Sequence, residues 1–177
     1  MRVSSHSLVT ELPLPRQEFT GRDFRDTLGA FATGVTVITT RGPEHHYGMT
    51  ASAFSSVSLD PPLILVCIAH AVEGAQAVDN NRVFAVNVLS AHQEPLSRYF
   101  SSKERPRGED AFREVPHREV VTGAPVLEGV AAWLDCSLHS AYDAGDHRIF
   151  VGEVLALGVH AGVPPLLFHA GQYRFLK

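Results

Sequence analysis

The chain has 177 residues, 45% of them hydrophobic and 19% charged, and its 15 Lys and Arg against 19 Asp and Glu give a formal net charge of −4. This length and composition predict one well-buried globular domain, and the apolar excess suggests a buried subunit interface. Because the net charge is negative and no Lys/Arg run occurs, we expect no nucleic-acid or membrane partner, which leaves small-molecule chemistry.

The N-terminal segment, residues 1–20, is mixed polar with two prolines, and we interpret it as a flexible arm before one domain over residues 21–177. It lacks the continuous apolar core of a secretory signal. The strongest apolar run, residues 63–68, is far shorter than the ~20 residues that a membrane-spanning helix needs. Cys67 and Cys136 lack the spacing of a zinc site or a redox dithiol. These features predict a cytoplasmic protein.

The first half of the domain alternates between helical and strand patterns. Thr20-Gly21-Arg22-Asp23 resembles a capping box, and the spacing of Phe24, Leu28 and Phe31 after it predicts a short amphipathic helix. By the same criteria Gly34 ends this helix, strands follow at 35–40, 50–58, 63–68 and 83–89, and helices at 70–81 and 91–100.

The second half is mainly β. Residues 101–116 are polar and charged and predict a surface excursion rather than a linker. Long β-rich stretches follow at residues 130–142, 147–159 and 166–175. Many strands, few helices and turn-marked junctions predict a mainly β fold, an antiparallel barrel with small helical additions. No Gly-x-Gly-x-x-Gly turn joins a strand to a helix, so a Rossmann-type dinucleotide site has no support.

The most informative segment is residues 48–62, GMTASAFSSVSLDPP, which crowds small and hydroxyl-bearing residues onto an extended stretch. A flat polar ligand can lie close to such a backbone and be met by N–H and O–H groups. This pattern suits a cofactor better than a core. The alternative is a half-buried strand whose hydroxyls face water.

Three motifs resemble the short-chain flavin reductase family and together cover roughly residues 22 to 177. They are residues 24–25 (FR) leading to 31–40 (FATGVTVITT), residues 48–62, and residues 144–147 (AGDH) with 150–154 (FVGEV). The resemblance implies an FMN-binding split β-barrel of antiparallel Greek-key topology, usually a homodimer. It implies an enzyme that transfers hydride from NADH or NADPH to FAD or FMN and supplies free reduced flavin to a partner monooxygenase.

By this resemblance, one group of residues lines the flavin ring edge and ribityl chain: Thr50, Ala51, Ser52, Ala53 and Ser56. Cys67, on the next strand, comes near the flavin in the family; its alternative role is that of a small core residue. Phe100 and Ser101 match a stretch where the chain passes the flavin, although Phe100 can equally cap the core beneath the 101–116 excursion.

His147 is the residue that we associate with activity. Gly145 allows a tight turn, Asp146 can orient the ring, and the imidazole can then project towards the nicotinamide carboxamide or its phosphates. The alternative is a turn histidine bonded only to backbone. Gly171 and Tyr173 match the family's other nicotinamide-side stretch, with a barrel-closing tyrosine as the alternative for Tyr173.

One departure concerns the flavin phosphate. Family members often carry Ser, Thr or Lys after the Cys67 strand, yet residues 69–74 read AHAVEG, and Glu73 repels a phosphate at close range. Either His70, Lys103 or Arg82 compensates, or the flavin tail takes another path, so the choice between FMN and FAD stays open. An adenine lying over residues 101–116 would suit FAD. The lack of an Arg cluster for a 2′-phosphate favours NADH over NADPH.

Four other classes of function have less support. Of ten histidines, His45 and His46 are the closest pair, but neighbours on a strand point to opposite faces, so we expect no metal. A serine hydrolase lacks its Gly-x-Ser-x-Gly elbow. A non-catalytic flavin-binding or flavin-sensing split barrel is the main alternative, and it would need neither His147 nor Tyr173. A split-barrel oxidase with its own substrate lacks added acid/base residues.

Overall fold

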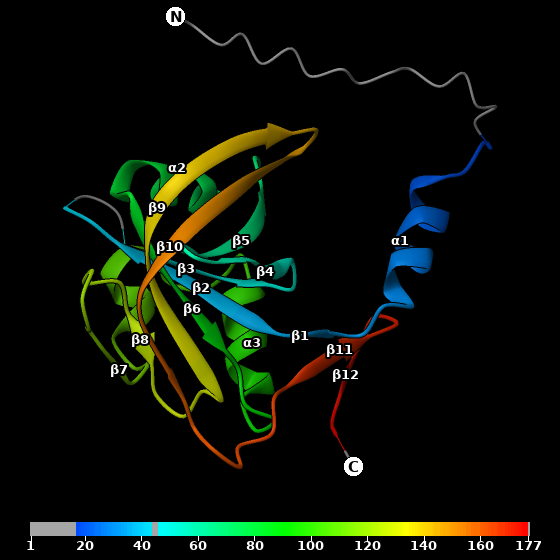
Figure 1. Cartoon of the computed structure of the whole chain (residues 1–177). Helices are drawn as coiled ribbons and strands as arrows, with labels where there is room; N and C mark the ends of the chain where they lie inside the picture. The colour runs from blue at the N-terminus through cyan, green and yellow to red at the C-terminus, as the bar shows by residue number, and fades with distance from the viewer. Residues whose placement is uncertain (1–16, 44–45, 177) are drawn as a thin grey trace, which may run out of the picture.

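A computed structural model describes residues 17–43 and 46–176, so residues 1–16 of the predicted arm, and His45 of the histidine pair, lie outside the described residues. The centre is a curled seven-stranded antiparallel sheet (Figure 1). In sheet order its strands are β3 (His46–Ala51), β2 (Thr36–Arg41), β6 (Val83–Val88), β9 (Ala132–Ala144), β10 (His147–Val159), β5 (Pro62–Ala69) and β4 (Phe54–Leu59). The mainly β antiparallel fold class predicted from the sequence is confirmed.

The inner face of this sheet holds the main core. In β5 burial alternates along the strand, so Ile64, Val66 and Ile68 point inward while Cys67 lies on the other face. Phe84 and Phe150 fill the space between them and α2 (Glu73–Asn81). Complete burial of each such side chain stabilises the fold by ~1.5–3 kcal/mol, which fixes the register of β5 and therefore the direction in which Cys67 points.

A second core forms where α3 (Glu94–Ser101) and the short 3₁₀ helix η1 (Gly108–Phe112) cover β3. Phe100 and Phe112 pack with ring centroids 5.6 Å apart. The 101–116 segment is therefore more than a surface excursion, because Ala111 and Phe112 are buried. Two further short strands, β7 (His117–Arg118) and β8 (Val126–Leu127), pair beside it.

The helix α1 (Gly21–Gly29) stands apart from the barrel (Figure 1). It connects through β1 (Thr33–Gly34) to a small sheet with β11 (Leu167–His169) and β12 (Gln172–Arg174). The predicted capping box is present at Thr20 and Asp23. None of the nine α1 residues, all of which the structure describes, is buried.

Several predicted boundaries are confirmed and others are wrong. β10 spans the predicted 147–159, and strands or helices occupy the other predicted positions with small shifts. The predicted strand 50–58 is instead interrupted at Ser52 and Ala53, between β3 and β4. The first helix ends at Gly29 rather than at Gly34. Residues 166–175 form a hairpin, because Ala170 and Gly171 turn the chain with positive φ.

Candidate active site

A cavity of about 580 Å³ opens where β3 passes into β4, beside β5, the start of α2 and the segment between α3 and η1. Its wall brings together eight of the residues singled out in the sequence: Thr50, Ala51, Ser52, Ala53, Cys67, Phe100, Ser101 and His147. Ser56 lies on β4 outside this lining. Gly171 and Tyr173 line a separate depression with Glu94 and Arg98.

The interruption at Ser52 and Ala53 builds the flat side of the cavity. Here the chain leaves β3 and enters β4, and both residues are exposed to the cavity with small side chains. The Cys67 N–H donates to the Ala53 carbonyl at 3.0 Å, which ties this connection to β5. Little side chain therefore separates a ligand in the cavity from the backbone.

Thr50 and Phe100 support this wall from behind. The Thr50 hydroxyl donates to the Ser97 carbonyl of α3 at 2.6 Å, so it holds the helix against β3. Phe100 is 1% exposed, and an added Cβ on Gly48 would lie 2.4 Å from its Cε1 atom. The ring packs on the bare backbone of Gly48, which is why glycine is needed there.

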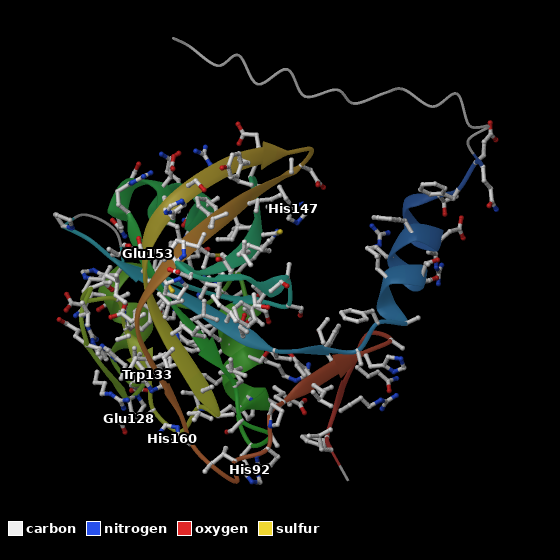
Figure 2. The ribbon with its side chains drawn as sticks, in the orientation of Figure 1. His92, Glu128, Trp133, His147, Glu153 and His160 are labelled. Atoms are coloured by element: carbon white, nitrogen blue, oxygen red, sulfur yellow. The ribbon has the colours of Figure 1, made fainter. Side chains whose placement is uncertain are left out.

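His147 begins β10 opposite Ala69 of β5, at the end of the barrel where the cavity opens, and it lines the same cavity as Ser52 (Figure 2). Its Nδ1 lies 2.7 Å from Asp146 Oδ1. This hydrogen bond holds the pKa of Asp146 below its ordinary value, so the carboxylate is ionised and accepts the Nδ1 proton. In the neutral ring Nε2 is then left as an acceptor.

The connection between α3 and η1 adds a cationic side to the cavity through Lys103, Arg105 and Arg107. Arg105 Nη2 donates to the Gly48 carbonyl at 2.6 Å, and its guanidinium lies 5.0 Å from the centre of the Tyr47 ring. Arg107 forms an ion pair with Glu73. Sequence reasoning missed both arginines, although three cations within five residues, Lys103, Arg105 and Arg107, were a local signal of a cationic segment.

The other side chains considered for the phosphate, His70 and Arg82, lie near acidic residues outside the cavity. His70 Nε2 lies 3.8 Å from Asp143 Oδ1, and Arg82 Nη1 lies 3.8 Å from Asp79 Oδ1. Neither side chain lines the cavity, whereas Lys103 does. Of the three side chains considered from the sequence, Lys103, which belongs to the α3–η1 connection, is therefore the one that brings positive charge to the cavity.

Tyr173 is linked to the cavity through α3. Its hydroxyl lies 2.9 Å from Ser97 Oγ, and the Arg98 guanidinium lies 4.8 Å from the centre of its ring. Ser97 is fully buried and also receives the Thr50 hydrogen bond on its carbonyl. Tyr173 therefore closes the C-terminal hairpin onto the helix that supports the cavity wall, and within one chain it does not enter the cavity itself.

The thiols and the remaining histidines do not suggest further chemistry. Burial raises the pKa of Cys67, and burial with the nearby Asp135 charge raises the pKa of Cys136 to about 12, so both are neutral thiols. Within the described ranges, no group of three His, Cys, Asp or Glu side chains is placed to hold a metal. His92, Glu128 and His160 lie at the opposite end of the barrel from His147 (Figure 2).

The donor set of the cavity fits a flavin nucleotide. An isoalloxazine ring is flat, with an apolar and a polar end, and its tail carries phosphate. The small wall at Ser52 and Ala53 would leave room for the flat ring, Ser101 and backbone groups would be available to its polar edges, and the α3–η1 cations would suit an anionic tail.

Comparison with known proteins agrees with this fit. A family model described as "Flavin reductase like domain" matches residues 28–177. An NADH-dependent FAD reductase of Streptomyces globisporus is 42% identical over 151 residues, 85% of this chain and 82% of that protein. The reductase subunit HsaB of a Mycobacterium tuberculosis flavin-dependent monooxygenase is 39% identical over 158 residues, 88% and 82% of the two chains.

Among solved structures, the flavin reductase component of a bacterial two-component tryptophan halogenase superimposes with a TM-score of 0.85. It is 41% identical, and the match covers 89% of this chain and 99% of that one. The barrel described above is therefore the split β-barrel expected from the sequence.

Proposed function

The chain belongs to the flavin reductase-like family, and we propose that the cavity between Ser52 and His147 is where this NADH-dependent flavin reductase brings its nicotinamide and flavin together. Its activity is the transfer of hydride from NADH to FAD or FMN. The observation that carries the site assignment is that His147 and the 50–53 wall, nearly a hundred residues apart, converge on one cavity.

When bound, the flavin supplies the redox chemistry, because its ring accepts the hydride that a nicotinamide releases. The residues of this chain bind and orient. Ala51, Ser52 and Ala53 keep the wall shallow enough for stacked rings. His147 presents Nε2 as an acceptor for the N–H of a nicotinamide carboxamide, and Asp146 fixes the ring in that tautomer. Cys67 adds a neutral, apolar contact.

Anaerobic oxidation of NADH, followed at about 340 nm with FMN, FAD or riboflavin added in turn, tests this assignment. Bleaching of the flavin at the rate of NADH loss is the expected result. Tight flavin binding without bleaching would instead support a non-catalytic flavin-binding protein. His147→Ala should raise KM for NADH or lower kcat while flavin affinity is preserved, and the opposite pattern would remove His147 from the nicotinamide side.

We propose that the chain acts as a homodimer. Apolar side chains face solvent on α1, just after it, on β4 and at the end of β10: Phe24, Leu28, Phe31, Leu59, Leu157 and Val159. Leu59 is 96% exposed and Val159 75% exposed, which is costly for a monomer in water. Light scattering on the full chain should give twice the monomer mass, and Leu157→Glu should lower that mass if the end of β10 is in the interface.

A separate monooxygenase is the partner class, because HsaB is a reductase subunit of such an enzyme. We propose that reduced flavin passes to it by diffusion, and that both work in the cytoplasm, where the two unpaired cysteines stay reduced. None of the described helices is long and apolar enough to span a membrane. Product formation by a flavin-dependent monooxygenase that is separated from the reductase by a dialysis membrane would support diffusion. Product formed when the two proteins are mixed, but not across the membrane, would instead require direct contact.

A further inference from the structure

The α3–η1 connection carries an ion pair on the cationic side of the cavity. Arg107 pairs with Glu73, the first residue of α2, and both side chains line the cavity. The side chains are 74% and 55% exposed, so the pair is solvated and contributes little to stability. It can therefore open at low cost when a better partner for Arg107 arrives.

We propose that Glu73 and Arg107 form an exchangeable latch, and that a phosphate ester of the bound nucleotide replaces Glu73 as the partner of Arg107. This rests on the proposed flavin reductase site. A phosphate dianion offers three acceptor oxygens to a guanidinium, and such charge-assisted hydrogen bonds are stronger than an exposed Arg–Glu pair. Glu73 thus disfavours phosphate binding twice, by occupying Arg107 and by repelling the incoming charge.

Arg105 and Lys103 complete the subsite and differ from Arg107 in how firmly they are held. Arg105 is fixed to the Gly48 carbonyl and to the carbonyl of Ser102, so it keeps a positive charge at the cavity wall whether or not a ligand is present. Lys103 lines the same side. Among the described residues that line the cavity, three basic side chains face one acidic side chain, Glu73, so removal of Glu73 leaves an uncompensated cationic wall.

The test compares equilibrium dissociation constants of FMN and riboflavin, measured by quenching of flavin fluorescence without NADH. These ligands differ only in the phosphate, so the ratio of their dissociation constants reports on the phosphate subsite and not on the site of the ring. Arg107→Gln should weaken FMN relative to riboflavin by about tenfold. Glu73→Gln should tighten FMN relative to riboflavin by about two- to fivefold. A gain in affinity cannot arise from misfolding, which makes the second variant the decisive one.

Arg113→Gln is the matched control. Arg113 pairs with Asp110 at 2.5 Å, is 75% exposed and lies in the same excursion outside the cavity lining, so its removal should leave the FMN-to-riboflavin ratio unchanged. NADH also carries phosphate, as a pyrophosphate diester whose oxygens can accept from Arg107, so KM for NADH is measured with riboflavin as the acceptor. A change in the FMN ratio identifies the flavin tail as the occupant, and a change confined to KM for NADH identifies the nicotinamide nucleotide.

The proposal is overturned if Glu73→Gln changes neither the FMN ratio nor KM for NADH, or if Arg113→Gln changes them as much as Arg107→Gln does. Failure of the proposed function would look different. Neither the unmodified chain nor any variant would then reduce a flavin, although the ratio of the FMN and riboflavin dissociation constants could still change between variants. Arg107→Lys supplies a second check: it keeps the charge and loses the two-pronged geometry, so its ratio should lie between those of the unmodified chain and Arg107→Gln.

Discussion

Replacement of Gly48 by alanine tests how the cavity wall is built. An added Cβ at this position would lie 2.4 Å from Phe100 Cε1 and 2.8 Å from its Cδ1, well inside van der Waals contact. The Phe100 ring is buried and touches the Tyr99 and Phe112 rings, so it has little room to retreat. Overpacking of this kind costs about 1–3 kcal/mol, and Gly48→Ala should lower the free energy of unfolding by that amount.

Urea titration monitored by the fluorescence of Trp133 measures this change, and a second variant shows where it comes from. Phe100→Leu in the Gly48→Ala background frees space at the contact, so the double variant should lose less stability than the two single changes added together. Gly34→Ala is the control, because an added Cβ there meets no atom within 4 Å and the residue has no positive φ. Equal losses for Gly34→Ala and Gly48→Ala, or strict additivity with Phe100→Leu, would refute the steric argument.

Three further predictions address stability and the site. Burial raises the pKa of Cys136 to about 12, well above the ordinary range of a thiol, so the unfolded state loses the proton first as pH rises. Unfolding free energy should therefore fall above about pH 9 by up to ~1.4 kcal/mol per pH unit, and Cys136→Ala should flatten that fall in urea titrations at about pH 8 and 10.5. Ser52→Leu should fill the cavity and weaken flavin binding at least about tenfold with little change in unfolding free energy, because residue 52 is exposed; unchanged binding by fluorescence titration would place the ring elsewhere. Deletion of residues 1–16 should leave flavin reduction intact, since every residue that lines the cavity lies between 46 and 147; lost activity at unchanged thermal stability would contradict the proposed 21–177 domain.

The barrel was predictable wherever local pattern and global fold agree. β10 matches its predicted limits because many β-branched and apolar residues lie along it, and Gly145, with a φ of 65°, begins the two-residue turn before it, where glycine is favoured. The interruption at Ser52 and Ala53 was not predictable in this way. Every residue from 50 to 58 is compatible with a strand, and the chain leaves the sheet there because β3 and β4 lie at its opposite edges.

In the candidate site too, features with a local sequence signal were predictable and features that depend on distant contacts were not. Small side chains and the Asp146–His147 pair are local signals, and the structure places both in the cavity. Arg105 and Arg107 lie in a cationic segment, but that signal does not place them in the cavity, because charged residues in a polar excursion usually face water. Their contacts lie far along the chain, with the Gly48 carbonyl 57 residues before Arg105. Thr50 looks like a ligand donor in sequence, but its hydroxyl bonds to Ser97.

The free edge of β3 explains why these distant contacts matter for the site. β3 is the last strand of the sheet, so one row of its backbone groups has no strand partner, and it is also the strand that leads into the Ser52 wall. Two contacts hold this edge: Arg105 binds the Gly48 carbonyl, and the Thr50 hydroxyl binds the Ser97 carbonyl of α3. Tyr173 fastens α3 in turn through Ser97 Oγ. The wall is thus fixed from both sides before a ligand binds, which lowers the ordering cost of binding, and α3 and η1 cover the strand edge and keep it from pairing with another chain.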